Sequence, residues 1–253
     1  MTALFEKVEG IVLRTKDYGE THKIVTLFSR EKGKFGIMAK GAKKPKSRMA
    51  SITQPFIHGH YLVQTGRNLG SLSQGEVISS LRGVREDIIK TAYAAYLAEM
   101  TDKMVEDKQP DPFLFQQFLQ TLIWITEDKD PEILTMMYEL KLYKKAGFAP
   151  QLDVCVNCSH ENGPFSFSVK EGGFLCFRCK HMDPEAYGLT EKMASLLRLF
   201  ANVDVARVGN ITIKEENKRK IRQLMDAYYD YYGGYYIKSK KFLKQLDLFK
   251  PED

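Results

Sequence analysis

The four cysteines of this chain form two C-x-x-C pairs, Cys155 with Cys158 and Cys176 with Cys179. Seventeen residues separate the pairs, which is a spacing typical of zinc sites. Each pair makes a tight turn that directs two thiolates toward one point, and two turns complete a tetrahedral shell of sulfur. Because this shell leaves no position for water, we expect a structural rather than a catalytic Zn²⁺ ion. Unused or redox-active cysteines are the alternative.

A basic segment at residues 34–48 contains no acidic residue, and Gly41 and Pro45 predict a loop there. A cationic loop beside a β surface neutralises phosphates and releases their counterions, which gives affinity without base preference. We therefore expect nucleic-acid contacts from nine cations: Arg14, Lys16, Lys23, Lys34, Lys40, Lys43, Lys44, Lys46 and Arg48. Arg30 and Arg67 could extend this surface. A merely solvated loop is the alternative.

Stacking of bases requires exposed aromatic rings near the cations. Tyr18, Phe35 and Tyr61 are close to the basic segment in sequence, but we expect each of them to pack inside the N-terminal fold.

The usual residue patterns of enzymes are missing. The chain has no phosphate-binding G-x-x-x-x-G-K-[ST], no H-E-x-x-H and no G-x-S-x-G. A zinc deaminase has proline before a C-x-x-C pair, where this chain has Val154 and Leu175. His160 and His181 lie just beyond the cysteine pairs and could replace a thiolate, although four sulfurs suffice. We expect a binding protein rather than an enzyme, and a metal-dependent nucleic-acid enzyme is the disfavoured alternative.

Composition and charge divide the chain. The 253 residues, 43% hydrophobic and 28% charged, can form one large domain or two or three small ones. Residues 1–80 hold 13 Lys and Arg against 6 Asp and Glu, whereas the rest of the chain is nearly neutral. The basic N-terminal part is therefore expected to face a polyanion. The first residues do not form a signal peptide and no apolar run is long enough for a membrane, so we expect a cytoplasmic protein with reduced thiols.

The N-terminal part, residues 1–80, is predicted to be a β-barrel. Five short apolar runs, at residues 10–13, 24–28, 35–39, 56–63 and 69–78, are separated by turn residues such as Gly19, Gly33 and Gly66. Five short strands in this length favour an OB-fold, with another small barrel as the alternative.

The remainder, residues 81–253, is predicted to be a helical domain, because apolar residues recur there at spacings of three and four. Asp111-Pro112 and Asp130-Pro131 are typical helix starts. The zinc-finger segment, residues 150–183, lies between helical segments and contains a predicted hairpin. It is therefore expected to be an insertion in an α+β multidomain protein rather than an independent finger.

Several segments resemble one family, the bacterial RecO recombinational DNA-repair mediators. They are GIVLRTKDYGETHKIVTLFSREKGKFGIMAKGAKKPKSR at residues 10–48, YELKL at 138–142, GFAP at 147–150 with Leu152 and Cys155 after it, and KSKKFL at 238–243. The resemblance covers essentially the whole chain, and its specificity lies in the order and spacing of the motifs. Some members of the family lack the cysteines, whereas this chain has all four.

The resemblance implies an OB-fold, a helical domain and a zinc module that together bind single- and double-stranded DNA and anneal complementary strands. It also implies three protein partners: RecR, the acidic Phe-ending tail of the single-strand-binding protein SSB, and indirectly RecA at the nucleoid. Lys141, Lys144 and Lys145, on the last helix before the zinc segment, could rim a pocket for that tail. A zinc-stabilised RNA-binding protein without a recombination role is the alternative function.

Overall fold

The computed structural model describes residues 5–66, 69–209 and 211–247 and forms two compact units. One unit comprises Met1–Pro131 with Ile237–Asp253, and the other comprises Glu132–Tyr236. The predicted domains, 1–80 and 81–253, instead separate the β-barrel part of the chain from its helical part. That division stays a prediction. Among the described residues, no helix combines the length and apolar composition that crossing a membrane requires.

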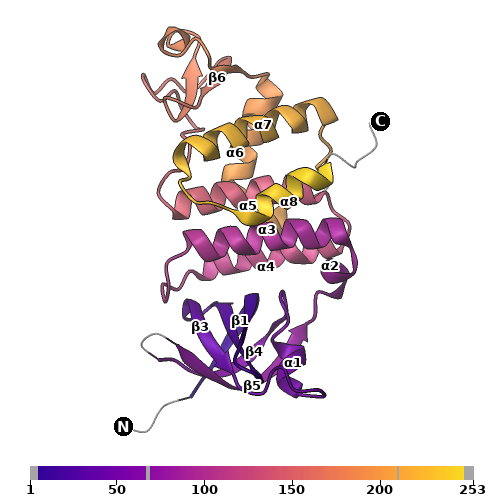
Figure 1. Cartoon of the computed structure of the whole chain (residues 1–253). Coiled ribbons are helices and arrows are strands. Elements are labelled where there is room, and N and C mark those ends of the chain that lie inside the picture. The colour runs from indigo at the N-terminus through magenta and orange to yellow at the C-terminus, as the bar shows by residue number, and fades with distance from the viewer. Residues whose placement is uncertain (1–4, 67–68, 210, 248–253) are drawn as a thin grey trace. The chain divides into compact units, whose positions relative to one another are not determined.

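The first unit contains a closed barrel of five strands in the order β1-β2-β3-β5-β4 (Figure 1). The strands are β1 (Glu6–Tyr18), β2 (His22–Ser29), β3 (Gly33–Ala39), β4 (His58–Gln64) and β5 (Gly70–Ser79). All pairings are antiparallel except that of β3 with β5. Together with the short helix α1 (Arg48–Ile52) between β3 and β4, this arrangement confirms the predicted OB-like barrel.

The long first strand closes the barrel. It pairs with β4 through Glu6–Ile11 and with β2 through Gly10–Tyr18. A register shift between Val12 and Arg14 bends it from one neighbour to the other. The interior is filled by apolar side chains from every strand, from α1 and from the connections between strands: Val8, Val12, Val25, Leu27, Phe35, Ile37, Ala39, Ala42, Ile52, Ile57, Tyr61, Val63 and Leu72.

The helices of the first unit are α2 (Arg82–Glu86), α3 (Ile88–Met104), α4 (Pro112–Thr126) and α8 (Lys238–Asp247). The predicted start of α4 is confirmed, because the Asp111 carboxylate accepts the Leu114 N–H at 2.9 Å and Pro112 follows it. Phe115 and Phe118 of α4 pack against Phe28 of β2, with ring centroids 5.7 and 6.1 Å apart. These contacts fix the helices against the barrel.

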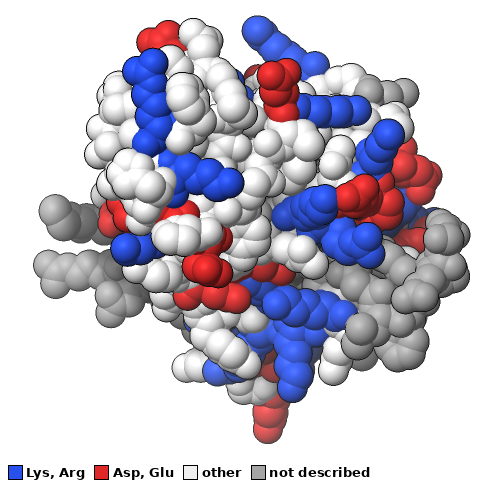
Figure 2. Space-filling model, turned by 90° about the horizontal axis from the view of Figure 1, so that it is seen from above, with Lys and Arg blue, Asp and Glu red and all other residues white. Residues whose placement is uncertain are grey.

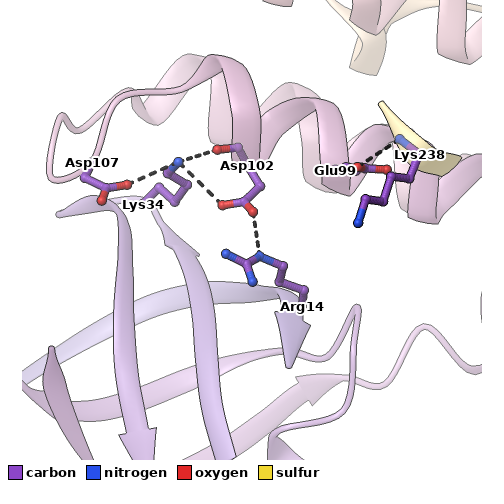
Figure 3. Close-up of polar contacts among 6 residues, drawn as sticks. All are labelled: Arg14, Lys34, Glu99, Asp102, Asp107 and Lys238. Carbon is purple, nitrogen blue, oxygen red and sulfur yellow. Dashed lines mark hydrogen bonds and ion pairs between the residues drawn. The ribbon is translucent and has the colours of Figure 1, made fainter. Parts of the chain in front are cut away.

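The last helix, α8, lies beside α3 (Figure 1). The Glu99 carboxylate of α3 accepts the backbone N–H group of Lys238 at 3.0 Å (Figure 3). It also accepts the backbone N–H group of Ser239 at 2.8 Å and the Ser239 hydroxyl at 2.6 Å. Burial alone would raise the pKa of Glu99, but these hydrogen bonds lower it. A carboxylate at a helix N-terminus satisfies free N–H groups and is favoured by the helix dipole. Glu99 therefore anchors the C-terminal helix to the first unit.

The second unit contains α5 (Pro131–Lys145), α6 (Glu191–Asn202), α7 (Glu215–Tyr232) and a small sheet in the order β7-β6-β8. The strands are β6 (Phe165–Ser168), β7 (Gly173–Cys176) and β8 (Tyr187–Gly188), and short 3₁₀ turns span Lys180–Met182 and Val205–Arg207. The predicted hairpin is therefore confirmed, and a third strand is added. Gly147, with φ of +83°, follows the end of α5.

The cysteine-bearing segment is attached to the helices of its unit. The Tyr232 hydroxyl of α7 donates to the Lys170 carbonyl at 2.9 Å. The Arg198 guanidinium of α6 donates to the carbonyls of Leu152 and Asp153 at 2.8 and 3.0 Å, and it lies 5.0 Å from the Phe165 ring centroid. The segment is thus an insertion held by α6 and α7.

Two details of the predicted elements were wrong. Ile89 follows the apolar spacing that predicts the helical domain, but it is 39% exposed, because it lies in the first turn of α3, ahead of the buried face that begins at Ala92. The apolar run from Phe56 was expected to be a strand throughout, yet β4 begins only at His58. Phe56 has φ of +68°, a left-handed conformation that is incompatible with strand pairing.

Candidate nucleic-acid interface and metal centre

The basic segment forms a compact turn, residues 40–47, between β3 and α1. Gly41 adopts a φ of +71°, which favours glycine. Ala42 is 1% exposed and anchors the turn in the barrel core. The Lys43 N–H donates to the Thr21 carbonyl at 3.0 Å, so the turn is held beside the connection between β1 and β2. Its lysines therefore project from the predicted loop, whose backbone is held by hydrogen bonds.

Five of the nine predicted cations are exposed and, among the described residues, have no carboxylate within ion-pair distance: Lys16, Lys40, Lys44, Lys46 and Arg48. Lys23 is half-buried. The Lys43 ammonium lies 3.1 Å from the Asp17 carboxylate. Arg67 lies outside the described residues. The exposed members of the set keep their charge available for an anion.

Arg14 and Lys34 are held by the helix next to the barrel (Figure 3). The Arg14 guanidinium lies 2.5 Å from the Asp102 carboxylate of α3. The Lys34 ammonium donates to the Asp102 carbonyl, and it pairs with the carboxylates of Asp102 and Asp107 at 3.5 and 3.1 Å. Lys34 is only 8% exposed, whereas the Arg14 side chain remains 60% exposed. We therefore leave Lys34 out of the proposed DNA surface and assign it to packing of β3 against α3.

Lys34→Met is expected to lower the free energy of unfolding by about 2–3 kcal/mol, because it leaves Asp102 with one cation and removes a donor from its carbonyl. Urea unfolding measures this loss. The exposed Lys16→Met is the control and should cost less than about 0.5 kcal/mol. A stable Lys34→Met protein with weakened DNA binding would reverse the assignment.

One row of side chains crosses the outer face of the barrel. Lys16 pairs with Ile24, Ile24 with Met38, and Met38 with Ser71. Residues directly opposite on neighbouring strands share a face. Val25, the neighbour of Ile24, is fully buried in the interior, so this row faces outward. A cation and apolar side chains are thus presented together across β1, β2, β3 and β5.

A shallow pocket of about 230 Å³ adjoins this row and is lined by Met38, Gln64, Thr65, Gly66, Leu69, Gly70 and Ser71. Tyr18, two residues after Lys16 on β1, is 50% exposed, contrary to the expectation that it is packed. Phe35 and Tyr61 are buried as predicted, at 3% and 1% exposure. Tyr18 is therefore the aromatic ring of this face that the sequence pattern missed.

The second site gathers the four cysteines, whose sulfur atoms all lie within 4.8 Å of one another. Cys158 is exposed and the other three are buried. Backbone hydrogen bonds shape both turns: the Ser159 N–H donates to the Cys155 carbonyl at 2.9 Å, and the Cys179 N–H donates to the Cys176 carbonyl at 3.0 Å. The Val156 N–H donates to the Phe174 carbonyl at 2.8 Å, which connects the first turn to β7.

These sulfurs fit a tetrahedral metal ion. Two thiolates on a Zn²⁺ ion with bonds of about 2.3 Å lie about 3.8 Å apart, and the sulfurs of Cys158 and Cys176 are 3.6 Å apart. The Asn157 amide donates to the Cys179 sulfur at 3.3 Å. Burial alone would raise the pKa of the Cys155 thiol, but backbone hydrogen bonds from Cys176, Cys158 and Asn157 lower it to about 6. Hydrogen bonding therefore favours the thiolate, the form that binds zinc, at Cys155. At Cys158 a backbone hydrogen bond from His160 lowers the pKa, but hydrogen bonds with the sulfurs of Cys176, Cys179 and Cys155 outweigh it and raise the pKa.

Two family models match the chain: "Recombination protein O N terminal" over residues 1–81 and "Recombination protein O C terminal" over residues 85–241. The DNA repair protein RecO of Oceanobacillus iheyensis is 55% identical over 98% of this chain and 96% of its own length. The proteins of the same name from Bacillus cytotoxicus and Bacillus subtilis are 52% and 48% identical, each over 98% of this chain and over 100% and 97% of their own lengths. This chain belongs to the RecO family. These relatives are DNA-repair proteins by name.

On one face of this RecO-family chain, charge alone does not single out a binding surface. In the face that Figure 2 shows, Lys and Arg side chains lie interspersed with Asp and Glu side chains and form no field of one sign. The net charge of +6 is therefore less informative than the local arrangement on the barrel.

Lys141, a predicted rim residue for the SSB tail, points into the second unit. It is 6% exposed, and its ammonium donates to the Phe200 and Met137 carbonyls at 3.0 and 3.5 Å. Burial lowers the pKa of Lys141 from its ordinary 10.5 to about 8, partly opposed by the charge of Asp204. An exposed peptide cannot reach this charge, so we remove Lys141 from the proposed pocket.

The buried Lys141 is expected to make stability depend on alkaline pH. Because its pKa is lower in the folded state, the unfolded state binds more protons between about pH 8 and pH 10.5, and the free energy of unfolding rises with pH in that window. Between about pH 8 and pH 10, the free energy of unfolding of the wild type should rise by about 2 kcal/mol relative to that of Lys141→Met. Urea unfolding of both proteins at several pH values measures the difference, and parallel curves would contradict the assignment.

Proposed function

We propose that this chain is a non-catalytic DNA repair and recombination mediator that binds single- and double-stranded DNA and anneals complementary strands. The observation that carries the proposal is the row of Lys16, Ile24 and Met38 across the OB-like barrel, beside the turn that presents Lys40, Lys44 and Lys46. The strand 2–3 face and neighbouring loops of OB-folds are where oligonucleotides bind. Family membership supports the same conclusion.

Electrostatics and stacking together account for the activity. Each cation that contacts a phosphate releases counterions, which gives affinity for any sequence. Neutralised strands repel each other less, so two of them can approach and pair. Tyr18 and Met38 offer a surface on which unpaired bases can stack until they find their complement. The four cysteines hold a Zn²⁺ ion in this proposal, which braces the second unit and contributes no chemistry.

The partners follow from the family. We propose that the chain acts with RecR in the cytoplasm, at the nucleoid, where the pair helps RecA to load onto SSB-coated DNA. Mixing complementary single strands with and without the purified protein tests the first step. Faster annealing at low salt, retained when SSB coats the strands, is expected. No acceleration would refute the mediator function, and selective binding of RNA would favour the RNA-binding alternative.

We propose that a pocket in the second unit holds the apolar end of the SSB tail. It has a volume of about 160 Å³ and is lined by Leu140, Lys144, Ala149, Pro150, Leu152, Asp153, Ala201 and Asn202. The exposed Lys144 supplies a cation for an acidic peptide, and five apolar residues supply a wall for its terminal phenylalanine. The lining also contains Asp153, whose carboxylate accepts a hydrogen bond from the Asn202 amide at 3.3 Å. Lys145 is exposed but does not line the pocket.

Lys144→Glu is expected to weaken binding of the tail peptide about tenfold, because it replaces attraction with repulsion at the rim. A titration with labelled peptide measures the loss. A peptide without its terminal phenylalanine should bind as weakly to the wild type. Lys192→Glu, an exposed change of the same charge on α6, is the control. If Lys144→Glu and the control bind alike, the tail lies elsewhere.

A further inference from the structure

One phenylalanine of the cysteine-bearing segment is exposed. Phe177 lies between Cys176 and Cys179 and is 59% exposed, whereas Phe165, Phe167 and Phe174 of the same segment are at most 4% exposed. Large apolar side chains exposed in this way often mark binding sites when polar groups surround them. The ring is not needed for the small core between the strands, which those three buried rings already fill.

The backbone that carries Phe177 is held by hydrogen bonds. The Met182 N–H donates to the Cys179 carbonyl at 3.0 Å, and the His181 ring nitrogen Nδ1 is 2.8 Å from the Arg178 carbonyl. Cys176 and Cys179 are both buried. The ring is therefore presented from an ordered turn, so little conformational entropy is lost when it contacts a ligand.

The surroundings of the ring are cationic. The Arg178 guanidinium lies 5.5 Å from the Phe177 ring centroid, within the range of a cation–π contact, and Lys180 is exposed. The acidic residues nearest to Phe177 in sequence are Glu171 and Asp183, at equal separation. Asp183 is 8% exposed and accepts a hydrogen bond from the Ser168 hydroxyl at 2.5 Å, and the Glu171 carboxylate lies 3.8 Å from the Lys170 ammonium. The first cysteine turn, residues 155–160, has no lysine, arginine, phenylalanine, tyrosine or tryptophan. The aromatic and basic character is thus confined to the second turn.

We propose that this second cysteine turn, residues 176–181, binds single-stranded DNA by stacking a base on Phe177 while Arg178 and Lys180 contact the flanking phosphates. An aromatic ring between cations matches an unpaired nucleotide, whose base offers a flat face and whose phosphate offers a negative charge. Bases in a duplex are already stacked on one another, so the contact is selective for single strands. The proposal rests on the proposed DNA binding and adds a contact in the second unit to the one on the barrel.

Phe177→Ala tests the contact in the full-length protein. Affinity for labelled oligothymidylate should fall about 5- to 150-fold, the loss expected for one base stacked on an aromatic ring. Affinity for a blunt duplex should stay within about twofold. Tyr187→Ala is the matched control: it removes a 41% exposed ring from the same sheet that has no basic neighbour in sequence, and it should leave both affinities unchanged.

Phe177→Trp provides a direct readout, because the only native tryptophan, Trp124, is 9% exposed. Its added fluorescence should be quenched by oligothymidylate and not by duplex. A folded Phe177→Ala protein with wild-type affinity, an equal loss for duplex, an equal loss in Tyr187→Ala, or no quenching in Phe177→Trp would overturn the inference. A wild type that binds neither DNA would instead refute the proposed function. If Phe177→Ala does not fold, quenching in Phe177→Trp decides.

Discussion

Reversing the charge of Lys44 and Lys46 together, as Lys44→Glu with Lys46→Glu, is expected to reduce affinity for a single-stranded oligonucleotide about 25-fold or more at about 0.1 M salt. Each phosphate contact on a single strand contributes roughly 0.7 to the slope of log affinity against log salt. Two lost contacts therefore remove about 1.4 logarithmic units between about 1 M and about 0.1 M salt. Titrations at several salt concentrations measure both the affinity and the slope.

Lys44 and Lys46 test the loss of phosphate contacts better than Lys43 does. Both are exposed, whereas Lys43 pairs with Asp17 and its backbone fixes the turn to Thr21. The Lys44 N–H still donates to the Gly41 carbonyl in the variant, at 3.1 Å in the wild type, so the turn is expected to keep its shape. Duplex affinity should fall as well, with a slope reduced by about 1.8.

A matched control separates a local contact from total charge. Lys192→Glu with Arg207→Glu changes the net charge by the same amount at two exposed positions of the second unit. Affinity and salt slope should remain close to those of the wild type. Should both double variants lose affinity equally, binding would depend on net charge and the barrel surface would be refuted.

The sequence allowed the elements and the cysteine site to be predicted because their signals are local. Glycine and alternating apolar residues marked the five strands, and the spacing of Cys155, Cys158, Cys176 and Cys179 alone indicated a common site. Asp111 and Pro112 identified the start of α4 within a single turn. The strands and the helix start depend on residues that are close in the chain. The metal site depends on cysteine, a residue type that has few roles in proteins.

Side chains whose partners are distant in sequence could not be placed. Lys34 looks like any member of the basic segment, and only the approach of Asp102, 68 residues later, removes it from the surface. The residues around Lys141 in the sequence do not distinguish it from an exposed lysine. Its burial depends on the Phe200 carbonyl, which lies 59 residues away. The docking of α8 on Glu99 spans about 140 residues. No periodicity encodes such pairings, because the same lysine or glutamate pattern is equally compatible with a solvated face.

Tyr18 was predicted to be packed in the interior, but it is exposed. An aromatic residue in a β segment is more often interior, and its neighbours Phe35 and Tyr61 follow that tendency. Tyr18 lies at the end of β1, beyond the stretch that pairs with β4, where the outer row continues past the closed part of the barrel. The exposure of Tyr18 depends on where the barrel closes. The register of the strands determines that point, and the apolar pattern alone does not reveal it.

Cys155→Ser is expected to abolish stoichiometric zinc binding and to lower the melting temperature of the second unit by about 10 °C or more. Cys155 is fully buried, and its sulfur accepts the Cys176 N–H at 3.4 Å. A serine hydroxyl is a poor zinc ligand, and without the fourth thiolate the free energy of metal binding no longer stabilises the fold. For a unit of this size, each kcal/mol corresponds to roughly 4–8 °C. Metal analysis of fresh protein and thermal unfolding measure the two effects.

The loss should be confined to the second unit. Chelation of zinc from the wild type should lower its melting temperature to that of Cys155→Ser, and added zinc should restore the wild type but not the variant. Ser195→Ala, an exposed change on α6, controls for mutation of the same unit and should keep both metal and stability. Duplex affinity, which we assign to the barrel, should be retained by Cys155→Ser, since the barrel belongs to the other unit. Fresh wild-type protein without zinc, or a variant as stable as the wild type, would show that the four sulfurs are not a structural metal site.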